Sequence, residues 1–155
     1  MCIRDSQLSV PFVERFFNLT QRNDRPEQAA GFVGIIVSNA FTKRSFGMKL
    51  VESHLPHWDL AYVIDASGAY LPDHATPTII MIGRNREPVE ESIRVVRGIR
   101  GEVLRPADPA RAPVWSAIVA QVDFPGSESR WVSVADARRE SFYVNPCLLY
   151  TSRCV

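Results

Sequence analysis

The residue types that most often carry chemistry, cysteine and histidine, are poorly placed for it in this chain. Cys2, Cys147 and Cys154 all lie near the two ends, and no pair has the CxxC spacing of a metal site. No histidine stands beside them at ligand spacing, and no histidine has a carboxylate partner at meaningful spacing. A disulfide between the ends lacks the support of an oxidising context. The sequence therefore predicts no metal site and no catalytic residue.

Polar residues that could meet a ligand follow an apolar, β-branched run at 32–37, which predicts a buried strand covered on both faces. Asn39 comes directly after this run, and Lys43 and Arg44 follow at the start of an expected helix. Asn39 fits a helix cap better than a substrate contact. The two cations fit either a solvated helix start or a cleft that receives phosphates.

Tyr70 occupies a second loop, 67–76, which follows another apolar run at 60–64. A tyrosine in such a Gly/Pro loop more often packs against its surroundings than binds a ligand. Ligands of open α/β sheets nevertheless bind outside the carboxyl ends of the strands. The Tyr70 loop and the Asn39 loop are therefore expected to face one cleft.

The elements that position these loops follow from hydrophobic spacing. The spacing predicts, in order, helix 8–22, strand 32–37, helix 41–55, strand 60–64, strand 78–82, strand 93–99, helix 114–122 and strand 131–134. A strand, a helix and a strand make one right-handed crossover, so the first two strands should run parallel. The loop 67–76 has no room for a helix, so the third strand should return antiparallel to the second. The predicted fold class is α/β, a mostly parallel sheet with a closing antiparallel hairpin plus a small mixed extension.

Composition narrows the class of protein. The chain has 155 residues, 46% of them hydrophobic and 23% charged, which is typical of a soluble globular protein. A net charge of +1 gives no bulk electrostatic case for nucleic-acid binding, although a local basic patch is compatible with it. No apolar run reaches the ~18 to 20 residues that span a bilayer. The N-terminus lacks the apolar core of a signal peptide, so a cytoplasmic protein without membrane contact is expected.

Both ends differ from the rest of the chain. MCIRDS (1–6) and CLLYTSRCV (147–155) resemble translated sequencing-adaptor ends found on reading frames from environmental DNA. We therefore expect 1–6 and 147–155 to be artefacts. The intervening chain is expected to divide into a domain part at 7–90 and the start of a following region at 91–146.

Two long runs carry a likeness to a known family: GFVGIIVSNAFTKRSFGMKLVESHLP (31–56) and WDLAYVIDASGAYLPDHATPTIIMIGRNREP (58–88). They resemble the large adenine-specific DNA methyltransferases of phage-defence systems of the phage-growth-limitation or bacteriophage-exclusion type. The likeness continues through IRVVRGIRGE, PVWSAIVAQVDFPGS and WVSVAD, and so covers nearly all of the chain between its ends. It implies the second half of a Rossmann-like sheet, because methyltransferases that use S-adenosylmethionine end their sheet with such an antiparallel hairpin.

The resemblance also implies what is missing. The family holds S-adenosylmethionine on a glycine-containing loop and catalyses with Asn-Pro-Pro followed by an aromatic residue, and neither motif is present here. Asn145-Pro146 lies at the wrong end and is followed by cysteine, so it does not match. The full-length parent is expected to use S-adenosylmethionine, whereas this segment is expected to bind no cofactor and to be inactive.

What remains, by the resemblance, is the substrate side of the site. Enzymes that modify a base flip it out of the duplex, and in related enzymes an aromatic residue in the loop between the last two strands holds it. Tyr70 is the aromatic residue in that loop, so it is expected to stack on the target adenine, with Lys43 and Arg44 near phosphates. Double-stranded DNA, and other phage-defence proteins, are the expected partners of the parent. The arginines after Arg84 receive no role, since Arg94 and Arg97 equally fit the solvated face of an edge strand.

A second hypothesis comes from a different class of protein. The same α/β segment could be a non-catalytic module that contacts DNA or another protein. A glycine loop and Asn-Pro-Pro-Phe/Tyr upstream of Gln7 in the source DNA would favour the enzyme.

Overall fold

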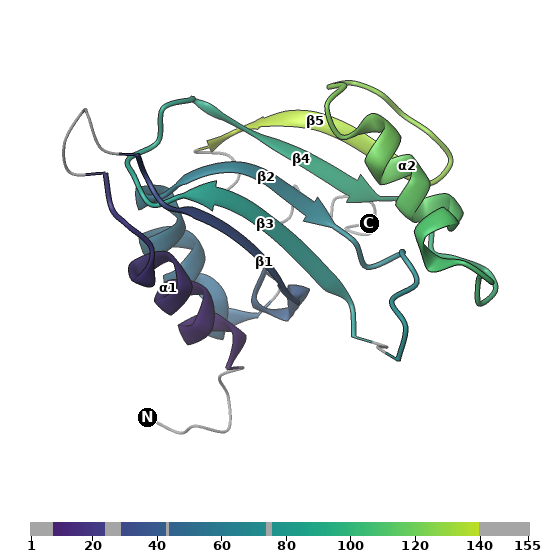
Figure 1. The fold of residues 1–155 in the computed structure, drawn as a ribbon, viewed down its shortest axis with the longest axis horizontal. Coiled ribbons are helices and arrows are strands. Elements are labelled where there is room, and N and C mark those ends of the chain that lie inside the picture. The colour runs from purple at the N-terminus through teal and green to yellow at the C-terminus, as the bar shows by residue number, and fades with distance from the viewer. Residues whose placement is uncertain (1–7, 24–28, 43, 74–75, 140–155) are drawn as a thin grey trace.

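The computed structural model describes residues 8–23, 29–42, 44–73 and 76–139 of the chain. Both adaptor-like ends, the three cysteines, Lys43 and His74 lie outside these described residues. The centre is a five-stranded sheet of order β1-β3-β2-β4-β5 (Figure 1). The helices and strands are α1 (Ser9–Leu19), β1 (Phe32–Ser38), β2 (Asp59–Asp65), β3 (Thr78–Arg84), β4 (Ser92–Gly98), α2 (Pro113–Gln121) and β5 (Val132–Arg138).

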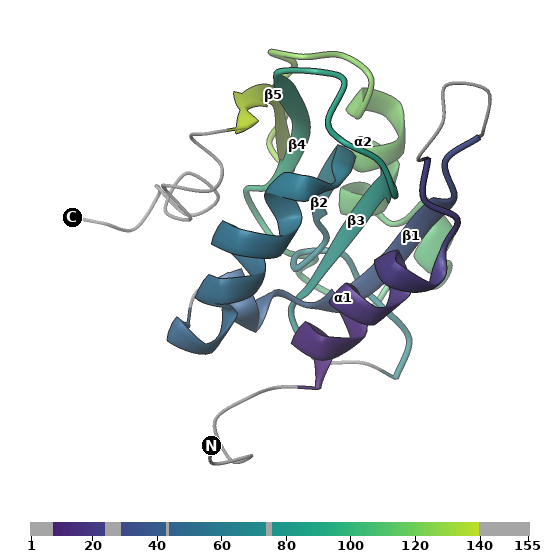
Figure 2. The same cartoon turned by 90° about the vertical axis from the view of Figure 1, so that its left-hand side faces the viewer.

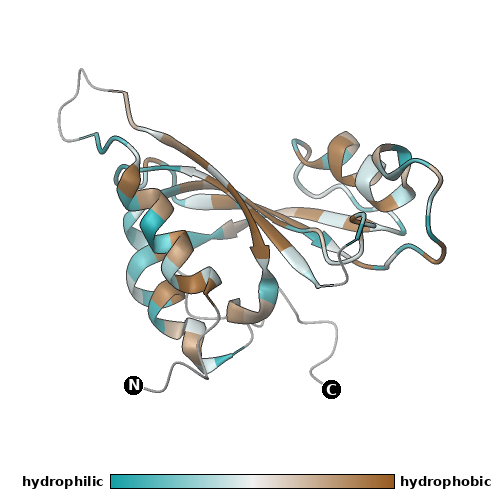
Figure 3. Ribbon diagram, turned by 60° about the horizontal axis from the view of Figure 1, so that its bottom comes forward, coloured by the Kyte–Doolittle hydropathy of each residue, from teal (hydrophilic) through white to brown (hydrophobic). Residues whose placement is uncertain are grey.

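The helices cover the two faces of the sheet at opposite ends. α1 and the helical turns between β1 and β2 lie on one face, and α2 lies on the other (Figures 2 and 3). Each face carries its own hydrophobic cluster, the first with α1 and the second with α2. The sheet is therefore fully covered on neither face, and the part of each face left open can meet other molecules.

The pairing of the strands corrects the predicted sheet. β1 and β2 both pair antiparallel with β3, β4 pairs antiparallel with β5, and only β2 and β4 pair in parallel. The expectation of a mostly parallel sheet was therefore wrong, whereas the antiparallel β2–β3 hairpin is confirmed. β1 and β2 do run in the same direction, as the crossover rule predicts, but β3 is inserted between them. The physical reason is that the short hairpin places β3 beside β2 on the side where β1 would otherwise pair.

β1 lies at the edge of the sheet. One of its faces is also exposed, so the prediction that both faces are covered was wrong. Val33 is buried under α1, but Phe32 is 63% exposed and Ile36 is 52% exposed on the opposite face. The sequence of an apolar strand does not show whether the elements that would cover its second face belong to the same segment of the chain. The predicted extension beyond residue 90 joins the same sheet, because β4 pairs with β2. The boundary near residue 90 stays a prediction.

The expected helix 41–55 forms as a succession of irregular turns. These are η2 (Asn39–Thr42), η3 (Ser45–Gly47), the π-helical η4 (Leu50–His54) and η5 (Leu55–His57). Phe41, Leu50, Val51 and Leu55 are buried and Phe46 is partly buried, whereas Met48 is 53% exposed. The burial pattern was therefore largely right and the helix type was not. Gly47 helps explain the irregularity, because a methyl group there would overlap the Phe41 carbonyl. The chain must bend tightly at this glycine before the helical turns resume.

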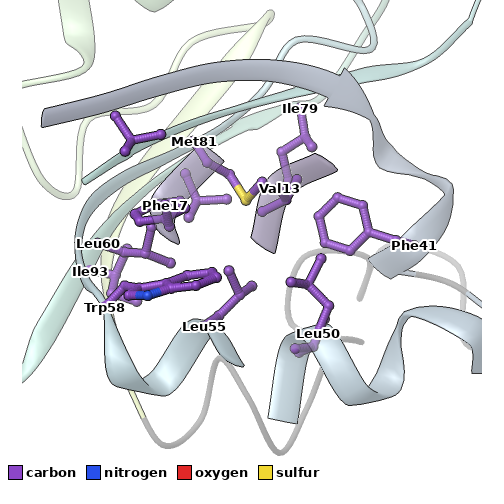
Figure 4. Packing of buried hydrophobic residues seen from close by; sticks show 13 residues of the cluster. Val13, Phe17, Phe41, Leu50, Leu55, Trp58, Leu60, Ile79, Met81 and Ile93 are labelled. Atoms are coloured by element: carbon purple, nitrogen blue, oxygen red, sulfur yellow. The ribbon is translucent and has the colours of Figure 1, made fainter. Parts of the chain in front are cut away.

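The first cluster is built around two stacked rings. Phe17 of α1 and Trp58 lie nearly parallel, with ring centroids 4.1 Å apart and an interplanar angle of 6° (Figure 4). Leu55, Leu60 and Met81 complete the packing around them. Offset aromatic pairs add to the gain from burying their apolar area. This stack joins α1 to the beginning of β2, although Phe17 and Trp58 are about 40 residues apart in the chain.

We expect Phe17→Ala to lower the free energy of unfolding of this chain by about 3 to 5 kcal/mol, because it leaves a cavity beside Trp58. Phe16→Ala is the matched control, since the neighbouring ring is 47% exposed on the outer side of α1. The control should change the free energy of unfolding by less than about 1 kcal/mol. Urea denaturation followed by tryptophan fluorescence measures both values. Equal losses would show that the Phe17–Trp58 stack does not anchor α1.

Candidate functional site

The carboxyl ends of β1 and β2 meet at one rim of the sheet, as the sequence predicts. Ser38 pairs with Thr78 and Asp65 pairs with Ile79, so the two strand ends flank the beginning of β3. Across this rim the Asn39 side-chain amide donates a 2.7 Å hydrogen bond to Ser67 Oγ. The two loops therefore come together where each leaves its strand, while the cleft that they are expected to share stays a prediction.

Ser67 is the centre of this connection. Asp65 Oδ1 accepts hydrogen bonds from the Ser67 backbone N–H at 3.0 Å and from the Ser67 hydroxyl. The carboxylate therefore closes the turn after β2. Asp65, Ser67 and Asn39 form a chain of hydrogen bonds, which we call the rim clamp. Sequence reasoning missed Ser67, whose position two residues after an aspartate is the signal of an Asx-type turn.

Asn39 is held inside the protein. Its side chain is part of the rim clamp, its backbone N–H donates to the Pro77 carbonyl at 3.0 Å, and the residue is only 3% exposed. The Asn39 side chain therefore does not form the predicted cap. Instead, Ser38 Oγ accepts a hydrogen bond from the Ala40 backbone N–H. Arg44, by contrast, is exposed at the start of η3, and Lys43 lies outside the described residues.

Tyr70 lies further along the same rim, beside the loop that follows β4. The Arg105 guanidinium carbon stands 5.7 Å from the centre of the Tyr70 ring, a cation–π distance. The two loops also touch through their backbones, because the Glu102 N–H donates to the Gly68 carbonyl at 3.0 Å. Within the described part of the chain, no hydrogen bond or ring contact joins Tyr70 to Asn39 or Arg44. The structure thus gives Tyr70 an arginine neighbour that the sequence did not single out.

A separate hollow lies at the opposite ends of the strands. It has a volume of about 600 Å³ and is lined by Phe32, Asp59, Leu60, Ala61, Tyr62, Gly83, Arg84, Arg86, Val89, Glu90, Ser92, Arg94 and Asp136. The Tyr62 hydroxyl donates to Asp123 Oδ1 at 2.9 Å, and Arg94 Nε donates to Asp136 Oδ1 at 2.6 Å. The hydrogen bond to the Asp123 carboxylate, with partial burial, raises the pKa of the Tyr62 phenol.

β4 pairs on both sides, so the interpretation of Arg94 and Arg97 as edge-strand residues was wrong.

Charged residues in and next to the wall of this hollow connect the strands through ion pairs and hydrogen bonds. Asp59 Oδ2 accepts from Arg86 Nε at 2.7 Å, while Asp59 Oδ1 lies 3.8 Å from Arg139 Nη2. Arg139 also donates to the backbone carbonyls of Trp58 and Leu60, at 3.3 and 3.1 Å. These pairings hold the beginning of β2 to the residues that follow β3 and β5.

Neither a metal site nor a membrane span is found in the part of the chain that the structure describes. Its residues hold no group of three or more histidine, cysteine, aspartate or glutamate side chains that could bind a metal ion. None of its helices is long and apolar enough to cross a bilayer.

Comparison with known proteins gives one informative match. The chain is 47% identical over 145 residues to the adenine-specific methyltransferase PglX of Streptomyces coelicolor. This match covers 92% of the chain but only 12% of the relative, so the chain spans a small part of that protein's length. No protein-family model matches the chain. The resemblance to this kind of adenine-specific methyltransferase, inferred from the sequence, is confirmed.

The rim clamp yields a testable expectation for stability. Ser67→Ala removes the acceptor of the buried Asn39 amide and one donor to Asp65, so the free energy of unfolding should fall by about 1 to 3 kcal/mol. Ser116→Ala, at an exposed position of α2, is the control and should change it by less than about 0.5 kcal/mol. Urea denaturation of the two variants provides the comparison. A Ser67→Ala variant as stable as the control would mean that the clamp contributes nothing to the rim.

Proposed function

We propose that this chain is a segment of an S-adenosylmethionine-dependent DNA adenine-N6 methyltransferase, which we call the parent enzyme. The observation that carries the proposal is the 47% identity to an adenine-specific methyltransferase over 92% of the chain. The parent enzyme would mark host DNA in a phage-defence system, act on double-stranded DNA in the cytoplasm, and work with other phage-defence proteins.

The order of the strands supports a place at the end of a methyltransferase sheet. β1 and β2 run in the same direction with the antiparallel β3 between them, and the chain from β1 to β2 crosses one face of the sheet. A parallel sheet that closes with an antiparallel hairpin is how these methyltransferases end. We propose that β1, β3 and β2 form this closing half of a Rossmann-like domain.

The open side of β1 supports the same placement. β1 is the last strand on its side of the sheet, so one row of its backbone N–H and C=O groups has no strand partner among the described residues. Beside it, the outer side of α1 exposes an apolar row at helical spacing: Leu8, Phe12, Phe16 and Leu19. Exposed edges and apolar patches of this kind are normally covered. We propose that the remainder of the methyltransferase domain covers both.

The methyl donor would be held elsewhere in the parent enzyme. The turn that leaves β1, at Ser38 and Asn39, has no glycine, and the Asn39 side chain is committed to the rim clamp. These residues do not fit a donor site, so no step of the reaction is assigned to them. The isolated chain is expected to be inactive.

The substrate side would lie at the rim. We propose that Tyr70 stacks on the flipped adenine and that Arg44, with Lys43, contacts nearby phosphates. Asn39 would act indirectly, because its burial and its bond to Ser67 suit a residue that positions the rim and does not touch DNA. Tyr70 is partly exposed, so its ring is accessible to a base, and the nearby Arg105 guanidinium helps to hold the ring in place.

Mapping of N6-methyladenine tests the proposed function. Expressed in a host without adenine methylation, the parent enzyme should add N6-methyladenine at one sequence motif in the genome. The 155-residue chain, expressed in parallel, should add none. Long-read sequencing detects the modification directly. If the parent enzyme leaves the genome unmodified, the methyltransferase proposal is wrong and the non-catalytic interaction module becomes the better account.

Tyr70→Ala in the parent enzyme should slow methylation about 5- to 150-fold, the equivalent of the ~1 to 3 kcal/mol that base stacking on an aromatic ring provides. Tyr70→Phe keeps the ring and should stay within about threefold of the unmodified enzyme. Phe124→Ala, at an exposed aromatic residue after α2, is the control and should have no effect. Transfer of labelled methyl groups to a duplex with the mapped motif measures all three. A near-normal rate for Tyr70→Ala would sink the stacking role.

A further inference from the structure

The loop between β4 and α2 presents two adjacent aliphatic side chains to solvent. Val103 is 83% exposed and Leu104 is 81% exposed, more than any other large hydrophobic residue among those described. The loop leaves β4 at the rim, because β4 runs parallel to β2 and so ends on the same side of the sheet (Figure 1). Two neighbouring apolar side chains exposed to this degree are candidates for contact with another molecule.

The chain directly before this pair is held by hydrogen bonds to neighbouring segments. The Ile99 N–H donates to the Trp131 carbonyl at 2.7 Å, and the Glu102 N–H donates to the Gly68 carbonyl. The Glu102 carboxylate accepts from the Val114 N–H at 2.7 Å, which ties the loop to the start of α2. The fit against the Tyr70 loop is close, because a methyl group on Gly68 would come within 2.6 Å of the Arg100 carbonyl oxygen. Val103 and Leu104 therefore project from a fixed base and are not the ends of a loose loop.

Cations flank the aliphatic pair. Arg100 and Arg105 are both exposed, and Arg105 lies over the Tyr70 ring. The carboxylate between these two arginines, Glu102, is engaged with the α2 backbone. An apolar tip between two exposed arginines, next to an aromatic ring, combines the groups that meet bases with the groups that meet phosphates. This combination is complementary to DNA, whose phosphates lie on either side of its stacked bases.

We propose that Val103 and Leu104 form a wedge that enters the base stack of duplex DNA next to the target adenine, while Arg100 and Arg105 contact the adjacent phosphates. Proteins that distort DNA insert aliphatic side chains between base steps in this way. A wedge would fill the gap that the flipped adenine leaves and would thereby favour the flipped state. The backbone bond between Glu102 and Gly68 joins the wedge to the Tyr70 loop, so the two would act at one base pair. This inference rests on the proposed methyltransferase function.

Two duplexes that differ only opposite the target adenine test the wedge. One carries the mapped motif fully paired, and the other carries a mismatched base opposite the target, which is then already unpaired. In the parent enzyme, Val103→Ala/Leu104→Ala should slow single-turnover methylation of the paired duplex at least about tenfold, since unstacking a base costs a few kcal/mol. On the mismatched duplex the same variant should stay within about twofold, because opening the pair is least costly at a mismatch.

Controls separate this role from its alternatives. Val119→Ala, an exposed aliphatic residue on α2, should leave both rates unchanged, and Leu104→Met should retain most of the rate on the paired duplex. Equal slowing on both duplexes, with a lower melting temperature, would overturn the wedge and show that the pair packs against another part of the parent enzyme. Unchanged rates on both duplexes would also overturn it. An unmodified parent enzyme that methylates neither duplex would instead overturn the proposed function, on which the wedge depends.

Discussion

The antiparallel insertion of β3 is the constraint on which the rest of the structure depends. All seven of its residues pair with β1 on one side and six of them pair with β2 on the other, so β3 fixes the direction and register of both strands. Because β1 and β2 are both antiparallel to it, their carboxyl ends meet at one rim. The Asn39 loop and the Tyr70 loop are brought together by backbone hydrogen bonds of this strand, and the rim clamp then secures them. β4 extends the rim, since it is parallel to β2.

Each half of the sheet has its own hydrophobic cover, and the two covers lie on opposite faces. The cluster under α1 stabilises the amino-terminal half of the sheet, and the cluster under α2 stabilises β4 and β5 on the opposite face. At the rim, the loops after β2 and β4 bring together an aromatic ring, arginines and exposed aliphatic side chains. At the other end, two of the three arginines that line the hollow, Arg86 and Arg94, pair with carboxylates, and the third, Arg84, lies over the Phe32 ring.

Much of the fold could be predicted because hydrophobic spacing is a local signal. The spacing located α1, α2 and all five strands to within a few residues, and connection lengths gave the β2–β3 hairpin. The place of β3 between β1 and β2 was not predicted, since local spacing does not say which edge a hairpin strand joins. The exposed face of β1 was missed for a related reason: Phe32 and Ile36 are as apolar as buried residues, and their exposure depends on which elements are near.

For the candidate site, the sequence located the loops but not the contacts within them. Tyr70 and Asn39 were picked because each follows a strand, and that reasoning uses position along the chain alone. The bond from Asn39 to Ser67 spans 28 residues, and the ring of Tyr70 meets Arg105 from a different loop. Contacts between segments so far apart in the chain depend on the register of the sheet and on side-chain rotamers, which no local pattern specifies.

Arg139 has a consequence for cooperativity. Its guanidinium bonds to carbonyls of Trp58, Leu60 and Glu90, residues that precede it by 81, 79 and 49 positions. Residue 139 directly follows β5, which belongs to the cluster under α2, whereas Trp58 and Leu60 belong to the cluster under α1. One buried side chain thus connects the end of β5 with residues of the cluster under α1. Opening either cluster would leave buried carbonyls or a buried charge without partners, so local opening in one half of the sheet is energetically linked to opening in the other.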